Sequence, residues 1–398
     1  MHTVIDTSAV QTASAFERLT SELHDMAGRI AAGDERAPVD LHRLISRLQG
    51  HADPRCTGLL VFASALAQRV SGAMAQTANL YLRRFEVPQI ELFNLLGRCM
   101  PMVTLATQVA NAVIAEALRG QAHATVIDIG IGTGRQIVAL LEQLQAAGKL
   151  PAELTVIGVE PGLDALAAAR SALAETTSRM GVALHFHGFA SCAEALTDAD
   201  WAAMQAQCAT RPVINASFAL HHIADNAQGH DQRSRVLRQL HALQPLALVL
   251  TEPDVDHLEP RFLPRFGHCL RHFGAVFDLL DALPITQAER DALKVGFFGR
   301  EIADVLGTAE PLRSERHEST SAWQRRLAET GFVAPRLATS LPGGLPVGLL
   351  ASGHRFVSVQ ARSTHVVLAS GGEPMVAILV ATPAASPARP NRHKHPPV

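Results

Sequence analysis

Three glycines at alternate positions are the first residues that could do chemistry, by bringing a ligand close to the backbone. The stretch 124–137 reads A-T-V-I-D-I-G-I-G-T-G-R-Q-I, which predicts a buried strand, a tight turn and a helix. Gly130, Gly132 and Gly134 occupy the turn, where the missing Cβ atoms leave room for a ligand. The dinucleotide fingerprint G-x-G-x-x-G fails because its sixth position is Arg135, and the phosphate loop G-x-x-x-x-G-K-[ST] has no match.

The pattern that remains, D-x-G-x-G-x-G from Asp128 to Gly134, resembles the cofactor loop of class I S-adenosyl-L-methionine (SAM) methyltransferases. The resemblance implies that Asp128 and the three glycines hold SAM. A strand, turn and helix without a cofactor is the alternative, because this motif alone is only moderately specific.

The ends of the next two expected strands supply further candidates, because ligands of open α/β sheets bind beyond the carboxyl ends of the strands. Strand 155–159 is followed by Glu160, whose carboxylate could accept both ribose hydroxyls of an adenosine ligand. Strand 183–187 is followed by Phe189 and Ala190, which could lie against an adenine ring. A solvated acid and a plain loop are the respective alternatives.

The fourth expected strand, 212–216, ends in V-I-N-A-S-F-A-L-H-H and carries polar side chains around its end. Asn215, Ser217, His221 and His222 would lie near the reactive methyl group of the cofactor. Histidine titrates near neutrality, so either imidazole could remove the proton of a hydroxyl acceptor, although paired histidines are often structural. No N-P-P-Y type sequence follows this strand, which favours a small acceptor over the amino groups of nucleic acids.

The fifth expected strand, 247–250, ends in L-T-E-P-D-V-D-H. Glu252, Asp254 and His257 would then stand around the same mouth and form a polar pocket for the acceptor, with Glu252 facing the reaction. Solvated loop charges are the alternative.

A helical region, and a region in which strands and helices alternate, must position these residues. Helical periodicity covers 37–120, with helices beginning near Asp40 and Asp53 and a third running from about 89 to 118. Strands and helices then alternate, which predicts a parallel sheet covered on both faces. Later we expect a helical insertion at 256–306, a helix at 323–331, and β-rich runs at 347–350, 355–358, 364–368 and 375–380.

Composition restricts the function classes. The chain has 398 residues, a formal net charge of −2 and 47% hydrophobic residues, so nucleic acid and anionic membranes are not expected partners. The amino terminus has no signal-peptide pattern, and no apolar run approaches the roughly 20 residues of a membrane span, which predicts a cytoplasmic protein. The 5 cysteines lack a C-x-x-C pair and the 19 histidines lack a nearby third ligand, so no metal site is expected.

From about residue 40 to 382, the chain resembles the GRAS family, known as plant transcriptional regulators and also found in bacteria. The resemblance lies in N-A-V-I-A-E-A-L, V-I-D-I-G, N-A-S-F-A-L-H-H-I, L-T-E-P-D-V-D-H, F-G-R-E-I and W-Q-R-R-L-A-E-T-G-F, in the order of the family. It implies a methyltransferase-like sheet under a helical cap, built from the amino-terminal helices and the insertion after the fifth strand. Arg300, in F-G-R-E-I, is added to the expected substrate pocket.

Two departures from the plant members favour a cofactor-using, bacterial-type member. Plant members generally lack an intact SAM loop, act through protein contacts and carry a terminal S-A-W signature. Here the glycine loop and Glu160 are intact, and the last strand reads V-A-I-L-V-A without that tryptophan. Methylation of a small molecule is the role that this resemblance implies. The alternatives are a noncatalytic GRAS-type scaffold that binds a small ligand or a protein, and a homodimer joined by the amino-terminal helices.

The expected fold class is therefore α/β: a Rossmann-like methyltransferase sheet of parallel strands with antiparallel C-terminal strands, helices on both faces and an α-helical cap. The expected segments are a flexible amino-terminal arm (1–36), the helical cap (37–120), the SAM-methyltransferase-like core (121–254), a helical insertion completing the cap (255–310), the C-terminal part of the core sheet (311–382) and a disordered tail (383–398).

Overall fold

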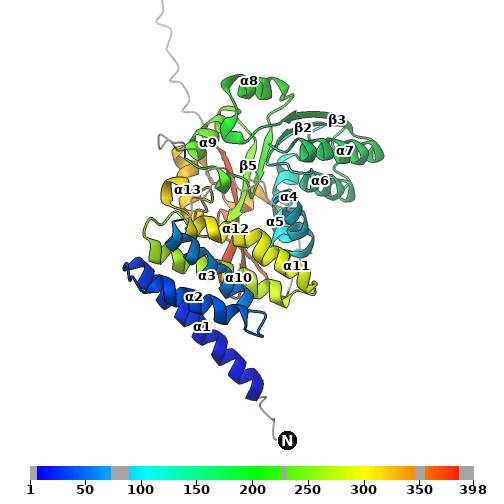
Figure 1. The fold of residues 1–398 in the computed structure, drawn as a ribbon. Helices are drawn as coiled ribbons and strands as arrows, with labels where there is room; N and C mark the ends of the chain where they lie inside the picture. The colour runs from blue at the N-terminus through cyan, green and yellow to red at the C-terminus, as the bar shows by residue number, and fades with distance from the viewer. Residues whose placement is uncertain (1–6, 73–88, 226–230, 346–354, 385–398) are drawn as a thin grey trace, which may run out of the picture.

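The computed structural model describes residues 7–72, 89–225, 231–345 and 355–384, and its centre is a nine-stranded sheet (Figure 1). The strand order is β3-β2-β1-β4-β5-β9-β8-β7, and β6 pairs with β9 off this path. The first five strands run parallel, whereas β9 runs antiparallel to β5 and β8. The order 3-2-1-4-5 is the Rossmann-like arrangement, so the expected fold class is confirmed. The strands are β1 (His123–Ile129), β2 (Glu153–Val159), β3 (Ala183–Phe189), β4 (Val213–Ser217), β5 (Ala247–Pro253), β6 (Phe332–Val333), β7 (Ser358–Ala361), β8 (His365–Ser370) and β9 (Glu373–Pro383).

The central strands are continuous runs of apolar residues because helices cover both of their faces. Along β1, Val126 points into one core layer and Ile127 into the other, following the period of two residues. The first layer is covered by α5 (Pro101–Ala117), α6 (Arg135–Ala146) and α7 (Leu163–Met180). The second is covered by α8 (Asp198–Gln207), α9 (Gln232–Ala242) and α13 (Thr320–Glu329).

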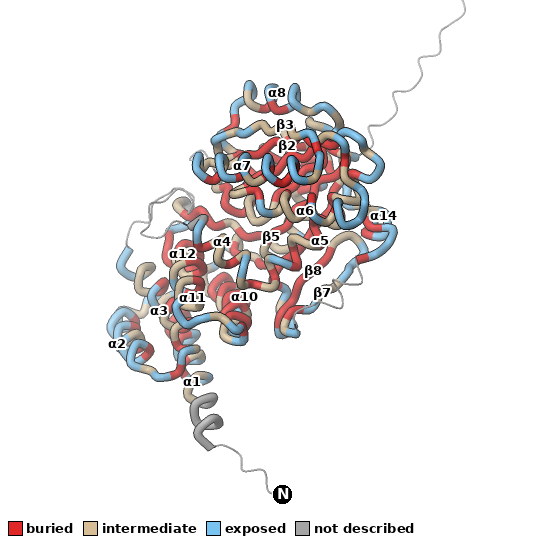
Figure 2. Tube along the Cα trace, turned by 90° about the vertical axis from the view of Figure 1, so that its right-hand side faces the viewer, coloured by how far each residue is buried: buried red, intermediate tan, exposed pale blue. Residues whose placement is uncertain are grey.

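A block of helices packs beside the antiparallel end of the sheet and continues the first core layer (Figures 1 and 2). It joins amino-terminal helices to helices that follow β5, and α3 contacts both α10 and the π-helical turn η5. Its members are α1 (Thr7–Ala31), α2 (Ala37–Gln49), α3 (Cys56–Ser71), α4 (Gln89–Cys99), α10 (Phe262–Ala282), α11 (Gln287–Asp291), η4 (Ala292–Phe298), α12 (Gly299–Ile302) and η5 (Ala303–Gly307).

The amino-terminal segment differs from the expected flexible arm of residues 1–36, because Thr7–Ala31 forms the helix α1. Leu19, Leu23, Met26 and Ala27 are buried at helical spacing against the other helices of the block. The polar, alanine-rich composition of residues 1–36 hides this stripe in the sequence.

Three other sets of expected helices and strands differ from the structure or lie outside the described residues. The helix expected at 89–118 is two helices, because Met100 is extended and Pro101, which has no N–H group to donate, opens α5. The run expected at 355–358 becomes a strand three residues later, as β7. The run expected at 347–350 and the tail from 385 lie outside the described residues.

None of the described helices is both long enough and apolar enough to cross a membrane.

Two glycines allow a test of how closely the helix block is packed. A Cβ at Gly58 of α3 would lie 2.7 Å from the Phe277 ring of α10, whereas a Cβ at Gly274 of α10 would meet nothing within 4 Å. We expect Gly58→Ala to lower the free energy of unfolding by about 1–3 kcal/mol through overpacking. Gly274→Ala should raise it by about 0.5–1 kcal/mol, because alanine favours a helix. Chemical denaturation of both variants measures the difference; equal effects would contradict this helix contact.

Candidate ligand-binding site

The glycine loop needs its glycines for backbone conformation and for close packing. Gly130, Gly132 and Gly134 have φ values of 78°, 53° and 79°, in the left-handed region that side chains disfavour. A Cβ at Gly134 would lie 3.2 Å from Ala169 of α7. The N–H group of Gly130 donates to the carbonyl of Val159 at 2.8 Å, so the loop rests on the end of β2.

The strand register brings the candidate residues to one edge. Ile129 is paired with Val159 on one side and with Ala216 on the other. The residues that follow these three, Gly130, Glu160 and Ser217, therefore emerge together at the carboxyl edge of the sheet.

A cavity of about 590 Å³ opens at this edge. Its wall contains six of the expected site residues: Asp128, Gly130, Gly132, Glu160, Ser217 and His222. The opposite wall comes from α4 and α5, through Phe93, Val103 and Thr107 among others. The cavity thus lies between the carboxyl edge of the sheet and the helices α4 and α5, and its volume is within the range of small-molecule sites.

Glu160 is held by the loop that it faces. Its two carboxylate oxygens accept the backbone N–H groups of Gly162 at 2.9 Å and Gly132 at 3.1 Å. Burial raises the pKa of Glu160, and these two hydrogen bonds oppose the shift. A carboxylate has about four acceptor positions, so lone pairs remain for a ligand in the cavity.

Asp128 belongs to a buried chain of amide hydrogen bonds. Asn215 Nδ2 donates to Asp128 Oδ1 at 2.8 Å, and Gln136 Nε2 donates to Asn215 Oδ1 at 3.1 Å. Burial raises the pKa of Asp128 to about 7, although the bond from Asn215 lowers it. Asn215 is fully buried and is not among the described residues that line the cavity, so it positions Asp128 from behind.

The turn after β4 is strained and carries the two histidines. Phe218 has φ 54°, unusual for a residue with a side chain, and its N–H group donates to the carbonyl of Thr251 at 2.8 Å. The short helix η3 (Leu220–His222) follows, with both histidine rings buried. The chain therefore turns sharply at the end of β4.

Glu252 lies behind this turn and not at the mouth of the cavity. It is fully buried, its Oε1 accepts the N–H group of Leu220 at 2.8 Å, and its Oε2 bonds to His221 Nδ1. Burial raises the pKa of Glu252 to about 8. The expectation that Glu252 faces the acceptor is corrected: β5 continues to Pro253, so residue 252 remains inside the sheet. It positions the histidine turn.

His222 lies at the junction of two cavities. It lines the large cavity and also a smaller one of about 60 Å³, which His221 lines as well. His222 Nδ1 bonds to Glu315 Oε1 at 2.9 Å, and burial lowers the pKa of His222 to about 4. The imidazole is therefore neutral at pH 7, with a carboxylate beside it.

Six other expected residues lie away from the cavity wall. Ser191 and Cys192 line the cavity where Phe189 and Ala190 were expected, and Gly134 packs on α7 instead. Asp254, His257 and Arg300 are not among the described residues that line either cavity. Asp254 accepts the N–H group of Thr320 at 2.7 Å and so caps the start of α13, and His257 is fully buried.

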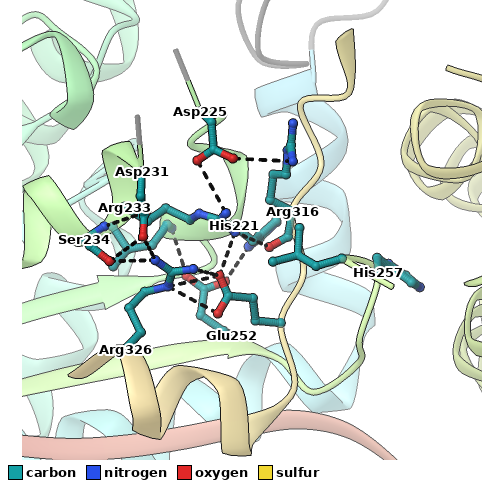
Figure 3. A network of polar contacts seen from close by, with 12 residues as sticks. His221, Asp225, Asp231, Arg233, Ser234, Glu252, His257, Arg316 and Arg326 are labelled. Atoms are coloured by element: carbon teal, nitrogen blue, oxygen red, sulfur yellow. Dashed lines mark hydrogen bonds and ion pairs between the residues drawn. The ribbon is translucent and has the colours of Figure 1, made fainter. Parts of the chain in front are cut away.

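The segment 313–318 is a buried stretch without helix or strand that carries Glu315 and His317, and no pattern in the sequence predicted it as part of the site. Figure 3 shows the network of ion pairs that holds it against α9 and α13. Arg233 donates to the carbonyl of Arg316 at 3.1 Å and pairs with Glu318 at 2.7 Å, and Arg326 pairs with Glu318 at 2.7 Å. The one signal in the sequence is the run of charged residues and histidine in R-S-E-R-H-E.

Comparisons with known proteins agree with this architecture. The sequence model of the GRAS domain family matches residues 19–368. GRAS family protein RAD1 of Lotus japonicus is 29% identical over 252 residues, which are 61% of this chain and 48% of that protein. The chain spans about half the length of the curated relatives it matches.

Solved structures agree on the fold. SCL7 of Oryza sativa superposes with a TM-score of 0.76 over 91% of this chain and 99% of that chain, at 23% identity, which shows a shared fold. The plantazolicin methyltransferase BamL, solved with a triazolic desmethylPZN analog and SAH, aligns over 82% of this chain and 98% of that chain with a TM-score of 0.43 and 12% identity. A likeness that distant carries no conclusion about the ligand of this chain.

Two substitutions at one position test whether Glu252 holds the histidine turn. Glu252→Ala leaves the Leu220 N–H group and His221 Nδ1 buried without that partner, and we expect it to cost roughly 2–4 kcal/mol of unfolding free energy. Glu252→Gln keeps an acceptor for Leu220 and a polar contact for His221, so it should cost clearly less. Urea unfolding of both variants decides; equal losses would show that side-chain volume, not hydrogen bonding, matters there.

Proposed function

Because the chain belongs to the GRAS domain family and carries an intact glycine loop, we propose that it binds SAM and methylates a small-molecule acceptor. One observation supports this above the others: the cavity of about 590 Å³ joins the glycine loop and Glu160 on one wall to residues of α4 and α5, among them Phe93 and Val103, on the other. An adenosine ligand and a partly apolar acceptor can share such a space. Formal net charge −2 gives no support for a nucleic-acid partner, and we place the protein in the cytoplasm.

The residues at the cavity fit the cofactor chemically. The wall at Gly130 and Gly132 has backbone in place of side chains, and Glu160 offers a carboxylate to two ribose hydroxyls. SAM is a sulfonium cation that supplies an electrophilic methyl group, and the carboxylates of Asp128 and Glu194 also line the cavity. The chain would hold the reactants in line and exclude water.

His222 is the residue that we assign to the acceptor, because it alone of the two histidines lines the large cavity. As a neutral imidazole next to Glu315, it can take the proton of a hydroxyl while the carboxylate stabilises the imidazolium. His221 lines only the smaller cavity and supports the turn from beneath.

The second candidate is a noncatalytic GRAS-type scaffold that binds a small ligand or a protein partner. The match to GRAS family protein RAD1, of which 48% is covered, favours it. The relatives compared above are plant proteins, so the bacterial type also stays a prediction.

Calorimetric titration with SAM and with S-adenosylhomocysteine tests the cofactor assignment. We expect micromolar binding of at least one of them. Glu160→Arg should abolish it, because a cation replaces the carboxylate at the ribose position. The matched control is Glu153→Arg, at the opposite end of the same strand, which should bind as the parent does.

Binding that persists in Glu160→Arg would contradict the site. If a correctly folded parent protein gives no heat with either compound, the scaffold becomes the preferred function and a partner should be sought instead. Turnover of SAM with candidate acceptors then separates a methyltransferase from a binding protein.

The affinity for SAM should depend on pH through Asp128, whose pKa is raised to about 7 by burial. Above pH 7 this carboxyl is ionised and attracts the sulfonium; below pH 7 it is protonated and the attraction is lost. We expect SAM binding to weaken by about three- to tenfold from pH 8 to pH 6. S-Adenosylhomocysteine, without the sulfonium charge, should change less.

Asp128→Asn should flatten this dependence while keeping the hydrogen bond from Asn215. An unchanged slope in Asp128→Asn would exclude Asp128 as its source.

A further inference from the structure

Three buried side chains converge beneath the large cavity, from segments far apart in the sequence. His221 Nε2 lies 3.7 Å from Glu315 Oε2, and His317 Nε2 lies 3.8 Å from the same oxygen. All three atoms lie within 4.8 Å of one another. The three residues are at most 3% exposed, so water does not surround these atoms.

Hydrogen bonds on the far side of the His221 ring favour a lone pair on the converging nitrogen. Glu252 faces Nδ1 of His221. A cation at the converging position favours the ionised form of Glu252, which accepts the Nδ1 proton of the neutral imidazole. Nε2 of His221 then carries a lone pair. This arrangement of carboxylate, histidine and ligand position is the usual support of a metal-binding histidine.

The His317 ring is oriented in the same way by another histidine. Its Nδ1 lies 2.8 Å from Nδ1 of His257, so one of these two nitrogens must carry the proton. When His317 is the donor, its Nε2 also carries a lone pair. Nε2 of His317 has no hydrogen-bond partner among the described residues, which is costly for a buried nitrogen.

We propose that His221 Nε2, Glu315 Oε2 and His317 Nε2 bind a divalent first-row transition-metal ion. Two imidazoles and one carboxylate form the ligand set of catalytic zinc sites and of non-haem iron sites. In a tetrahedral shell with bonds near 2.0–2.1 Å, ligand atoms lie about 3.3 Å apart. Closure on an ion requires each imidazole nitrogen to approach the Glu315 oxygen by about 0.4–0.5 Å, and the two nitrogens, which lie within 4.8 Å of each other, to approach by up to about 1.5 Å.

Hydrogen bonds already hold the backbone of the two segments that carry the three proposed metal ligands. The N–H group of Arg316 donates to the carbonyl of His221 at 2.8 Å, which ties the two ligand segments together directly. The N–H group of Glu315 donates to Asp304 Oδ2 at 2.8 Å, and the backbone N–H group of His257 donates to the carbonyl of His317 at 3.1 Å. Little conformational entropy remains to be lost when an ion binds.

The ion would have room for a further ligand. The smaller cavity of about 60 Å³ is lined by His221, His317 and Glu301, and it is large enough for a water molecule. Phe93, Phe218 and His222 line both this cavity and the larger one. A fourth coordination position would therefore face space next to the proposed acceptor site, where a metal acts as a Lewis acid.

Titration of the chelator-stripped, full-length protein with Zn²⁺ tests the site, with metal analysis of the protein as purified. We expect one Zn²⁺ per chain. His317→Gln should weaken Zn²⁺ binding at least about 100-fold by removing a ligand. Glu252→Gln should weaken it about 10- to 100-fold, because the amide donates to His221 Nδ1 and moves the proton to Nε2.

His272→Gln is the matched control, a buried histidine that lines the same small cavity without belonging to the triad. It should bind Zn²⁺ within about threefold of the parent. Circular dichroism checks that each variant is folded. X-ray absorption at the zinc edge of the parent needs no variant, and it should show nitrogen and oxygen ligands including imidazole.

Three results would overturn the proposal: no stoichiometric Zn²⁺ or Fe²⁺ binding by the folded, stripped parent, unchanged affinity in both His317→Gln and Glu252→Gln, or sulfur in the zinc ligand shell. Zn²⁺ binding requires no SAM, and SAM titration of the stripped protein is a separate measurement. Failure of one assignment is thus distinguishable from failure of the other.

Discussion

Burial of the polar segment 313–318 is the constraint on which the arrangement of the molecule depends. The segment forms no helix or strand, yet Arg313, Ser314, Glu315, His317 and Glu318 are almost fully buried. Buried polar atoms need partners inside the protein, since each one left without a partner costs about 1–3 kcal/mol. The partners come from every layer: Asp304 from the helix block, His221 from the sheet edge, Arg233 from α9 and Arg326 from α13. The segment therefore fixes the helix block relative to the sheet.

That fixed relation determines the large cavity. One wall follows from the register of β1, β2 and β4, which local sequence largely specifies, and the other comes from α4 and α5. The Phe218 turn lies where both walls meet, and its ring packs on Phe93 with centroids 6.2 Å apart. A residue with positive φ persists only where the surroundings hold it, and here Thr251 and Glu252 of β5 bind the backbone on both sides of the turn.

The features that depend on local sequence pattern could be predicted from the sequence. The β1 strand, the glycine turn and Glu160 follow from apolar runs ending in glycine or acid, and the structure places them together. The position of Glu252 could not be predicted, because the extra length of β5 depends on pairing with β9, more than a hundred residues later. Glu315 and His317 could not be found in this way, since the segment has no period and its partners become neighbours only after the chain folds.

Burying histidines and carboxylates in a core carries a desolvation penalty. Apolar side chains of similar volume often give equal or greater stability than buried charges, so packing alone does not account for this cluster. Nor does hydrogen bonding, because His257 Nε2 and His317 Nε2 lack hydrogen-bond partners among the described residues. Violations of this kind concentrate at functional sites, where stability is given up for chemistry. Here they lie directly beneath the cavity at the glycine loop, and His222 contacts both spaces. The polar cluster thus adjoins the cavity in which the proposed reaction would take place.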